Sequence, residues 1–359
     1  MIRKLSILAI ILASFNTIGQ ELTIPTVVHI VYNEASQNMT DAEVHQLLFQ
    51  VNENLKGAST NSMISREIFD TLRADTEIKL CLATIDPNGQ STSGIVRAQT
   101  NMTSLFGDFA FPTMVSPKWD ITNFFNLWIY SWGPQSAEVM GGFALIPGDM
   151  VFVVNEPVGC IINRDFSTSA SVFANLATHE VGHYFGLLHT FDSDNINDTP
   201  CSNENIGPSS TCFPTDNTIN TCNSDFAFWN EDAPDMIENF MSYHLGCQNM
   251  FTKGQKEKMR QTVFSSFSTL LDNQNIACID LTIPEIDQLQ PSFFPNPASD
   301  YIQIQGNIER IKLISFDGRI VKEVVCTMEN QQIAVQELSN GYYLLFSEQQ
   351  CLGTLIISH

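Results

Sequence analysis

The sequence predicts an α/β (α+β) domain with a mixed, twisted sheet, followed by a small β-sandwich. In the first part, apolar runs typical of strands alternate with segments of helical periodicity as far as residue 271. Beyond that point the helical pattern stops, and short alternating segments separated by Asp-Gly and Asn-Gly turns follow. The 359 residues suffice for one large domain and one smaller domain.

Each element of the first domain is predicted from its own local pattern. We expect a strand at 22–32, a helix at 41–55 with Thr40 or Asp41 near its N-cap, a strand at 76–86, a strand around Trp128, a glycine-punctuated strand pair at 141–154, a helix beginning near Ser169, and a final helix at 252–271. The short strands of the sandwich lie within 291–359, after a polar linker at 272–290.

The first twenty residues have the composition of a secretory signal peptide. Arg3 and Lys4 precede an apolar run from Leu5 to Ala13, which is too short to span a bilayer, and small and polar residues follow. No later stretch approaches transmembrane length. The sequence therefore predicts a soluble, exported protein, secreted or held at the cell surface.

The chain is strongly acidic, with 39 acidic and 17 basic residues and a formal net charge of −22. Such a charge repels nucleic acid and anionic membrane surfaces, so neither is an expected partner. Most of this charge is explained as a solvated surface, although acidity also suits calcium binding.

The histidines cluster in one segment, "HEVGHYFGLLHTF". Of seven histidines in the chain, His179, His183 and His189 lie within eleven positions. Residues four apart on a helix share a face, so His179 and His183 can bind one metal ion, while Glu180 beside them can reach a metal-bound water. Gly186 allows the helix to end in a left-handed conformation, and the chain can then return His189 to the same point.

The alternative reading is an amphipathic helix that carries histidines by chance. A His-Glu-x-x-His pattern alone supports either reading about equally. The added glycine and third histidine make up the metzincin signature, whose other half is a methionine-containing turn downstream. Met241 and Tyr243 in "ENFMSY" supply that half. Three neutral nitrogens with one open position predict a catalytic zinc site.

The cysteines predict disulfides in an exported protein. Cys201, Cys212, Cys222 and Cys247 fall in a span that is poor in apolar periodicity and rich in Asn, Ser, Thr and Pro. Crosslinks there would hold the methionine turn beneath the zinc helix. Four cysteines allow three pairings, and spacing does not choose between them.

Residues 21–271 resemble the pappalysin-type metzincins, in particular the cytophagalysin, ulilysin and mirolysin group. The resemblance rests on "IPTVVHIVY", "GFALIPG", the zinc motif, "NDTP", "NFMSY" and "CQNMFTKGQKEKM", in that order. It implies a zinc endopeptidase acting on proteins or peptides. His179, His183 and His189 would bind zinc, Glu180 would be the general base, Met241 would support the metal site, and Tyr243 would approach the metal or the oxyanion.

The same resemblance implies further features of the domain. It suggests the disulfides Cys201–Cys222 and Cys212–Cys247, and calcium near "DSDNINDTP", for which Asp194, Asp198 and Thr199 are candidate ligands. The strand from Phe143 to Pro147 is the expected edge to which a substrate adds. Relatives that cut beside Arg or Lys carry an aspartate where this chain has Gly246, so we expect weak preference for basic residues unless Asp232 or Glu238 serves the pocket.

The tail from residue 291 resembles the C-terminal sorting domain of type IX secretion cargo. "FFPNPASDYIQI" and "LSNGYYLLF" carry this resemblance, which implies the type IX machinery as a partner. For the first domain two other functions stay open: an exported adhesion module that keeps the fold around a structural metal, and a different metzincin branch such as an astacin-like or serralysin-like enzyme.

Overall fold

The strand β1 (Leu22–Tyr32) lies at the centre of the larger sheet in a computed structural model. The structure describes residues 20–59, 66–101, 111–131, 141–147, 159–192, 194–203, 219–223, 229, 232–244, 246–272, 278–279, 292–305, 310–315, 319–325, 332–347 and 351–359. The chain divides into two units, Met1–Leu281 and Thr282–His359. This division falls inside the expected linker, and all but the last residue of the expected signal peptide lies outside the described residues.

The sheet of the first unit is mixed, as predicted. Its strands follow the order β5-β6-β4-β1-β2-β7, with β3 also paired to β1. Most neighbours are parallel, but β5 runs antiparallel to β6, and β7 antiparallel to β2. The remaining strands are β2 (Ile78–Ala83), β3 (Ile95–Gln99), β4 (Phe125–Tyr130), β5 (Gly142–Ala144), β6 (Cys160–Asn163) and β7 (Cys278–Ile279).

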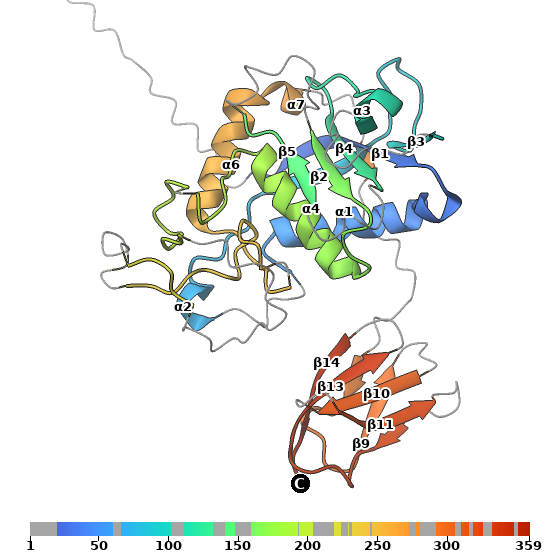
Figure 1. The fold of residues 1–359 in the computed structure, drawn as a ribbon, viewed down its shortest axis with the longest axis vertical. Coiled ribbons are helices and arrows are strands. Elements are labelled where there is room, and N and C mark those ends of the chain that lie inside the picture. Colours follow the sequence, from blue (N-terminus) through green and yellow to red (C-terminus); the bar gives the residue numbers. More distant parts are fainter. Residues whose placement is uncertain are drawn as a thin grey trace, which may run out of the picture. The chain divides into compact units, whose positions relative to one another are not determined.

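Two long helices cover one face of this sheet (Figure 1). These are α1 (Asp41–Leu55), capped by the Thr40 hydroxyl, and α4 (Ala170–Tyr184). The Asn54 amide on α1 donates to Asn175 and Thr178 on α4 and ties the helices together. The other helices are η1 (Ala35–Gln37), α2 (Glu67–Asp70), α3 (Phe111–Val115), α6 (Lys253–Ser266) and α7 (Thr269–Asp272).

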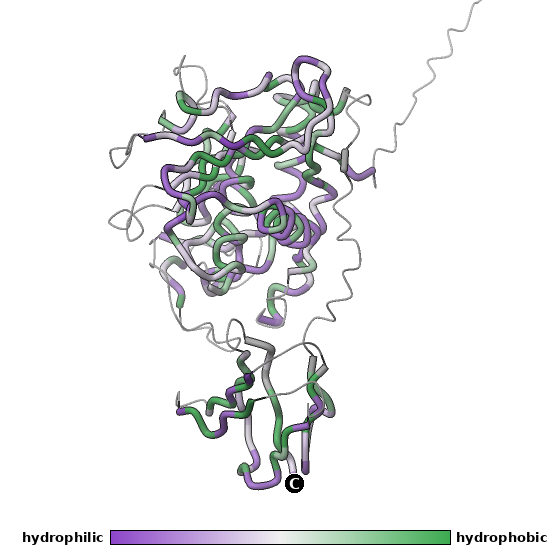
Figure 2. Tube along the Cα trace, turned by 90° about the vertical axis from the view of Figure 1, so that its right-hand side faces the viewer, coloured by the Kyte–Doolittle hydropathy of each residue, from purple (hydrophilic) through white to green (hydrophobic). Residues whose placement is uncertain are grey.

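Side chains along β1 point alternately to the two faces of the sheet, and this alternation divides the apolar core of the first unit. Ile24, Val28 and Ile30 point into the main cluster beneath α1 and α4, while Val27 and Val31 point to smaller clusters on the opposite face. Figure 2 shows apolar stretches, in green, inside this unit. Among the described helices, none combines the length and the apolar character that a membrane span requires.

Several boundaries differ from the sequence predictions, and the strand expected at 76–86 is shortened to β2, Ile78–Ala83. The expected helix at 252–271 breaks after Ser266, because Phe267 leaves the helical conformation to bury its ring, and α7 follows. Of the expected strand pair at 141–154, only β5 lies in the described part of the chain. Within the expected linker, Cys278 and Ile279 pair with Ala83 and Leu82, so this part of the linker belongs to the first sheet.

The second unit contains two antiparallel sheets, which confirms the predicted β-sandwich. One has the order β11-β10-β13-β14 and the other β12-β9-β8. Ile302, Ile304 and Ile333 from the smaller sheet share one core with Leu313 and Leu345 from the larger sheet. The strands are β8 (Ser292–Phe294), β9 (Tyr301–Gln305), β10 (Arg310–Ser315), β11 (Ile320–Val325), β12 (Gln332–Ala334), β13 (Gly341–Ser347) and β14 (Cys351–Ile357).

Candidate metal centre and active site

Helix α4 carries the first part of the site. The Ser169 hydroxyl caps its start by accepting from the Val172 amide. Its end is formed by Gly186, whose φ of +91° is the left-handed conformation expected from the sequence. A Cβ at Gly186 would also lie 2.5 Å from the Thr262 hydroxyl. The glycine therefore allows the reversal that brings His189 back toward the helix.

The three histidines point one nitrogen each at a common position. His183 Nε2 lies 3.1 Å from His179 Nε2 and 3.0 Å from His189 Nε2. Tetrahedral zinc with Zn–N bonds of about 2.0–2.1 Å separates its ligand nitrogens by about 3.3 Å. The donor set and its spacing therefore fit one zinc ion. Within the described residues these histidines are the one group of three or more His, Cys, Asp or Glu donors close enough to hold a metal.

The Nδ1 atom of each ring faces away from this common position, and its hydrogen bond determines which ring nitrogen carries the proton. His179 Nδ1 donates to the Phe240 carbonyl at 2.7 Å, and His183 Nδ1 to the Leu187 carbonyl at 2.8 Å. Because a carbonyl can only accept, Nδ1 carries the proton and Nε2 keeps its lone pair for a metal. His189 Nδ1 instead contacts a carboxylate oxygen of Asp192 at 2.6 Å.

Burial keeps these rings neutral. It lowers the pKa of His183 to about 4 and the pKa of His179 well below its usual value, and the neighbouring histidines add to the shift. Burial also lowers the pKa of His189, although the hydrogen bond and charge of Asp192 oppose the change. Neutral imidazoles are the form that binds zinc, so the site is ready for metal at neutral pH.

Glu180 lies beside this cluster and against β5. It is buried, and burial raises the pKa of its carboxyl to about 8. A Cβ at Gly142 would lie 2.7 Å from Glu180 Oε1, so β5 passes directly along the carboxylate. β5 is the terminal strand in the order of the sheet. Of the expected substrate edge Phe143–Pro147, only Phe143 and Ala144 lie in this strand, because the strand ends at Ala144.

The methionine segment lies beneath α4. Met241 is fully buried, and its sulfur occupies the space where Gly182 on α4 lacks a Cβ. The Met241 amide donates to Asn239 Oδ1 at 2.9 Å. Asn239 and Gln255 on α6 also exchange two amide hydrogen bonds of 2.8 and 2.9 Å. Helix α6 therefore fixes the position of this segment.

Tyr243 stands at the edge of the histidine cluster. Its ring centroid lies 4.8 Å from that of His189 and 5.6 Å from that of His179. Burial raises the pKa of its hydroxyl, and the charges of Glu180 and Asp192 raise it further. The protonated hydroxyl is thus available as a hydrogen-bond donor near the metal position.

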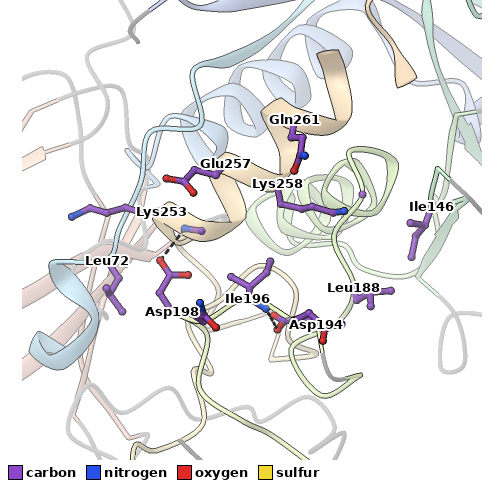
Figure 3. A pocket seen from close by; sticks show the side chains of 14 residues that line it. Leu72, Ile146, Leu188, Asp194, Ile196, Asp198, Lys253, Glu257, Lys258 and Gln261 are labelled. Carbon is purple, nitrogen blue, oxygen red and sulfur yellow. Dashed lines mark hydrogen bonds between the residues drawn. The ribbon is translucent and has the colours of Figure 1, made fainter. Parts of the chain in front are cut away.

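The three candidate calcium ligands lie in the loop after the zinc motif. Asp194 accepts from the Thr199 hydroxyl at 2.8 Å, whereas Asp198 turns to α6 and accepts from Thr252 Oγ1 at 2.7 Å and from the Gly254 amide at 2.9 Å. Asp194 and Asp198 line one cavity of about 860 Å³, together with residues of α6. Figure 3 shows the Asp198 side chain against the start of this helix. The structure therefore brings Asp194 and Thr199 together, while Asp198 caps a helix.

Of the expected disulfides, Cys201–Cys222 is formed, with 5.7 Å between the two Cα atoms. Cys247 is also disulfide-bonded. Cys212, its expected partner, lies outside the described residues. Cys160 on β6 is a free, buried thiol.

Sequence reasoning missed two contacts that support the site. Arg66 and Glu238 are both buried and form a bidentate ion pair with N–O distances of 2.7 Å. Glu238 lies three residues before Met241. These partners are 172 positions apart, and a single Arg or Glu in a polar stretch gives no signal of its own. Asp192 was also missed, although its place three residues after His189 could have suggested the contact.

Comparison with protein families now places both units. Residues 112–264 match the family described as pregnancy-associated plasma protein-A, a family of metallopeptidases. Over these residues the first unit is similar to the pappalysin family. Residues 292–353 match the secretion system C-terminal sorting domain.

Solved structures and curated proteins agree with this assignment. Tannerella forsythia mature mirolysin in complex with a cleaved peptide is 26% identical, with a TM-score of 0.59, over 70% of this chain and 94% of that chain. A promirolysin mutant of the same organism is 25% identical, with a TM-score of 0.59, over 70% of this chain and 83% of that chain.

Two extracellular metalloproteases are similar over a shorter region. That of Podospora anserina is 38% identical over 134 residues, which are 34% of this chain, and that of Arthroderma benhamiae is 30% identical over 140 residues, which are 35% of this chain. This chain spans 39% and 43% of their respective lengths.

Proposed function

We propose that this chain is a secreted, zinc-dependent endopeptidase of the pappalysin family that hydrolyses peptide bonds in proteins or peptides. The observation that carries the proposal is the convergence of three Nε2 atoms next to a buried glutamate, Glu180. The similarity to mirolysin and to extracellular metalloproteases supports the same activity.

In this mechanism Glu180 moves the proton. A zinc ion held by His179, His183 and His189 would supply Lewis acidity and make a water acidic enough to attack a carbonyl. The Glu180 carboxylate accepts the proton of the attacking water and then gives it to the leaving amine, because it lies buried beside the histidine cluster, within reach of both groups. The Tyr243 hydroxyl donates a hydrogen bond to the oxygen that becomes negative.

Strand β5 orients the substrate. A peptide added along the Phe143–Pro147 segment would present its main chain to the sheet by β-augmentation. Since β5 passes along Glu180, the scissile bond would then lie between the carboxylate and the histidine cluster.

The test separates zinc binding from catalysis. Glu180→Ala should reduce peptide cleavage by at least ~100-fold, the usual weight of a general base, while bound zinc stays at one per chain. Glu53→Ala on α1 is the control and should keep both properties. A Glu180→Ala protein that cleaves at the parental rate would disprove the mechanism.

The exported binding module is the second candidate. A structural zinc site fills four positions with protein ligands, whereas the metal-binding group in the described residues offers three. This geometry favours the enzyme. A parent protein that binds zinc stoichiometrically and cleaves no peptide in a diverse library would favour the binding module instead.

We also propose that calcium supports the loop after the zinc motif, with Asp194 and Thr199 as ligands and Asp198 nearby. Burial, with a contribution from the charge of Asp198, raises the pKa of Asp194 to about 6. A hard cation would relieve this unfavourable charge. Selective removal of calcium from the zinc-loaded protein should lower its melting temperature and speed autolysis, and no change in either would rule out this role.

Specificity follows from the residues after Met241. Gly246 offers no carboxylate to a basic substrate side chain. Glu238, one of the alternatives, is already paired with Arg66, and Asp232 accepts from the Asn220 amide at 3.0 Å. We therefore propose weak preference for Arg or Lys after the scissile bond.

The sorting domain supports secretion, and we propose the type IX machinery as its partner. In this proposal residues 1–20 are the signal peptide, 21–271 the protease domain, 272–290 the linker and 291–359 the sorting domain. The C-terminal domain would be the secretion signal, and the first unit would be the enzyme.

A further inference from the structure

The three histidines differ in what holds the nitrogen that faces away from the metal position. Two of them donate to main-chain carbonyls, of Phe240 and Leu187. His189 contacts the charged Asp192 carboxylate instead, at the shortest of the three distances, 2.6 Å. Such charge-assisted hydrogen bonds are about twice as strong as neutral ones.

His189 is also the most exposed of the three. Its side chain is 19% exposed, whereas His179 and His183 are buried. It comes from the loop after α4, so no helix fixes its ring. A ligand on a loop and open to water is the one through which a metal ion is most easily lost.

Neighbouring side chains hold the His189 ring in place although it lies on a partly exposed loop. The Phe191 ring stacks on the imidazole at 4.6 Å and 10°, and Tyr243 meets it edge-on at 4.8 Å. The Asp192 amide donates to the His189 carbonyl at 3.1 Å, which closes a short turn and sets the carboxylate against Nδ1. Three contacts therefore hold the ring in the orientation that points Nε2 at His183.

We propose that Asp192 is a positioning residue that holds His189 in its zinc-binding tautomer and sets how tightly the site keeps its metal. The proposal rests on the zinc assignment made above. A carboxylate behind a ligating imidazole makes the ring a stronger donor, and loss of such a partner costs about 10- to 100-fold in metal affinity. Asp192 contacts neither substrate nor reacting atoms in this role.

Two substitutions separate the charge of Asp192 from its geometry. Asp192→Asn keeps an oxygen that accepts from Nδ1 but removes the charge, and Asp192→Ala removes both. Glu53→Gln on α1 is a control that removes one negative charge elsewhere. Zinc affinity is measured by competition with a chelator of known affinity, and zinc release by its rate into excess chelator.

Asp192→Ala should weaken zinc binding by about 10- to 100-fold and release zinc correspondingly faster. Asp192→Asn should fall between the alanine variant and the parent, and Glu53→Gln should match the parent. The metal-free proteins should melt at similar temperatures, because the Asp192 side chain is 47% exposed and such surface pairs contribute about 0–1 kcal/mol.

Zinc affinities of both Asp192 variants within twofold of the parent would overturn the inference. A fall in metal-free stability with unchanged zinc affinity would overturn it as well, since Asp192 would then be merely structural. If the parent itself binds no zinc, the failure lies with the proposed function and not with Asp192.

Discussion

Loss of the buried ion pair between Arg66 and Glu238 should strongly reduce the stability of the first unit. Their side chains are 3% and 2% exposed, and the guanidinium also donates to the Asp235 carbonyl. Arg66→Met keeps most of the side-chain volume but leaves the Glu238 charge buried without its partner. Breaking a buried pair in this way costs about 3–5 kcal/mol. Since domains are stable by about 5–15 kcal/mol, the variant should lose a large part of its stability.

The assay is urea unfolding of the parent, Arg66→Met and the double variant Arg66→Met/Glu238→Leu. Removing both charges should recover most of the loss, because the desolvated carboxylate is then gone. Arg97→Met is the control, since its partner Asp41 is 60% exposed and such surface pairs contribute about 0–1 kcal/mol. The reasoning is refuted if Arg66→Met costs no more than Arg97→Met, or if the double variant is as unstable as the single variant.

Four further predictions concern packing, pH, export and specificity. Gly182→Ala should cost about 1–3 kcal/mol in urea unfolding, because the new methyl group would meet the Met241 sulfur. In metal-free buffer the charge of Asp194, with a pKa of about 6 against a usual 3.8, destabilises the fold above pH 6 but not below about pH 4. Asp194→Asn should therefore raise the free energy of unfolding at pH 8 by up to about 3 kcal/mol, with a higher melting temperature, and leave both unchanged below pH 4. Deletion of residues 291–359 should block export and leave peptide hydrolysis by the purified first unit intact; loss of hydrolysis in the folded truncation would make the tail part of the enzyme. For paired peptides that differ in Arg against Leu after the scissile bond, kcat/KM should differ by less than ~100-fold, about 2.7 kcal/mol, and a larger preference for Arg would reveal another carboxylate in the pocket.

The predictable parts of the molecule are those encoded in local patterns. Thr40 and Ser169 cap helices where the sequence places an N-cap, and Gly186 ends α4 where a left-handed residue is required. The spacing of the histidines on and after α4 is a local property, and for this reason their convergence could be anticipated. The mixed sheet followed from alternating apolar runs in the same way.

The parts that were missed depend on partners distant in the sequence. β7 is two residues long and is a strand only because it pairs with Ala83 and Leu82. β6, at Cys160–Asn163, is too short to show a period, and its burial comes from α4 and β4. Asp198 resembled a metal ligand because its loop is acidic, whereas its carboxylate caps α6 more than fifty residues away.

The paired amides of Asn239 and Gln255 have a consequence for the timing of activity. They connect the methionine segment to α6, so the support beneath the histidine cluster is complete only when residues 253–266 have been synthesised and have docked. The zinc motif itself ends some sixty residues earlier. A nascent chain that already carries all three histidines would therefore still lack the support beneath them until α6 is in place.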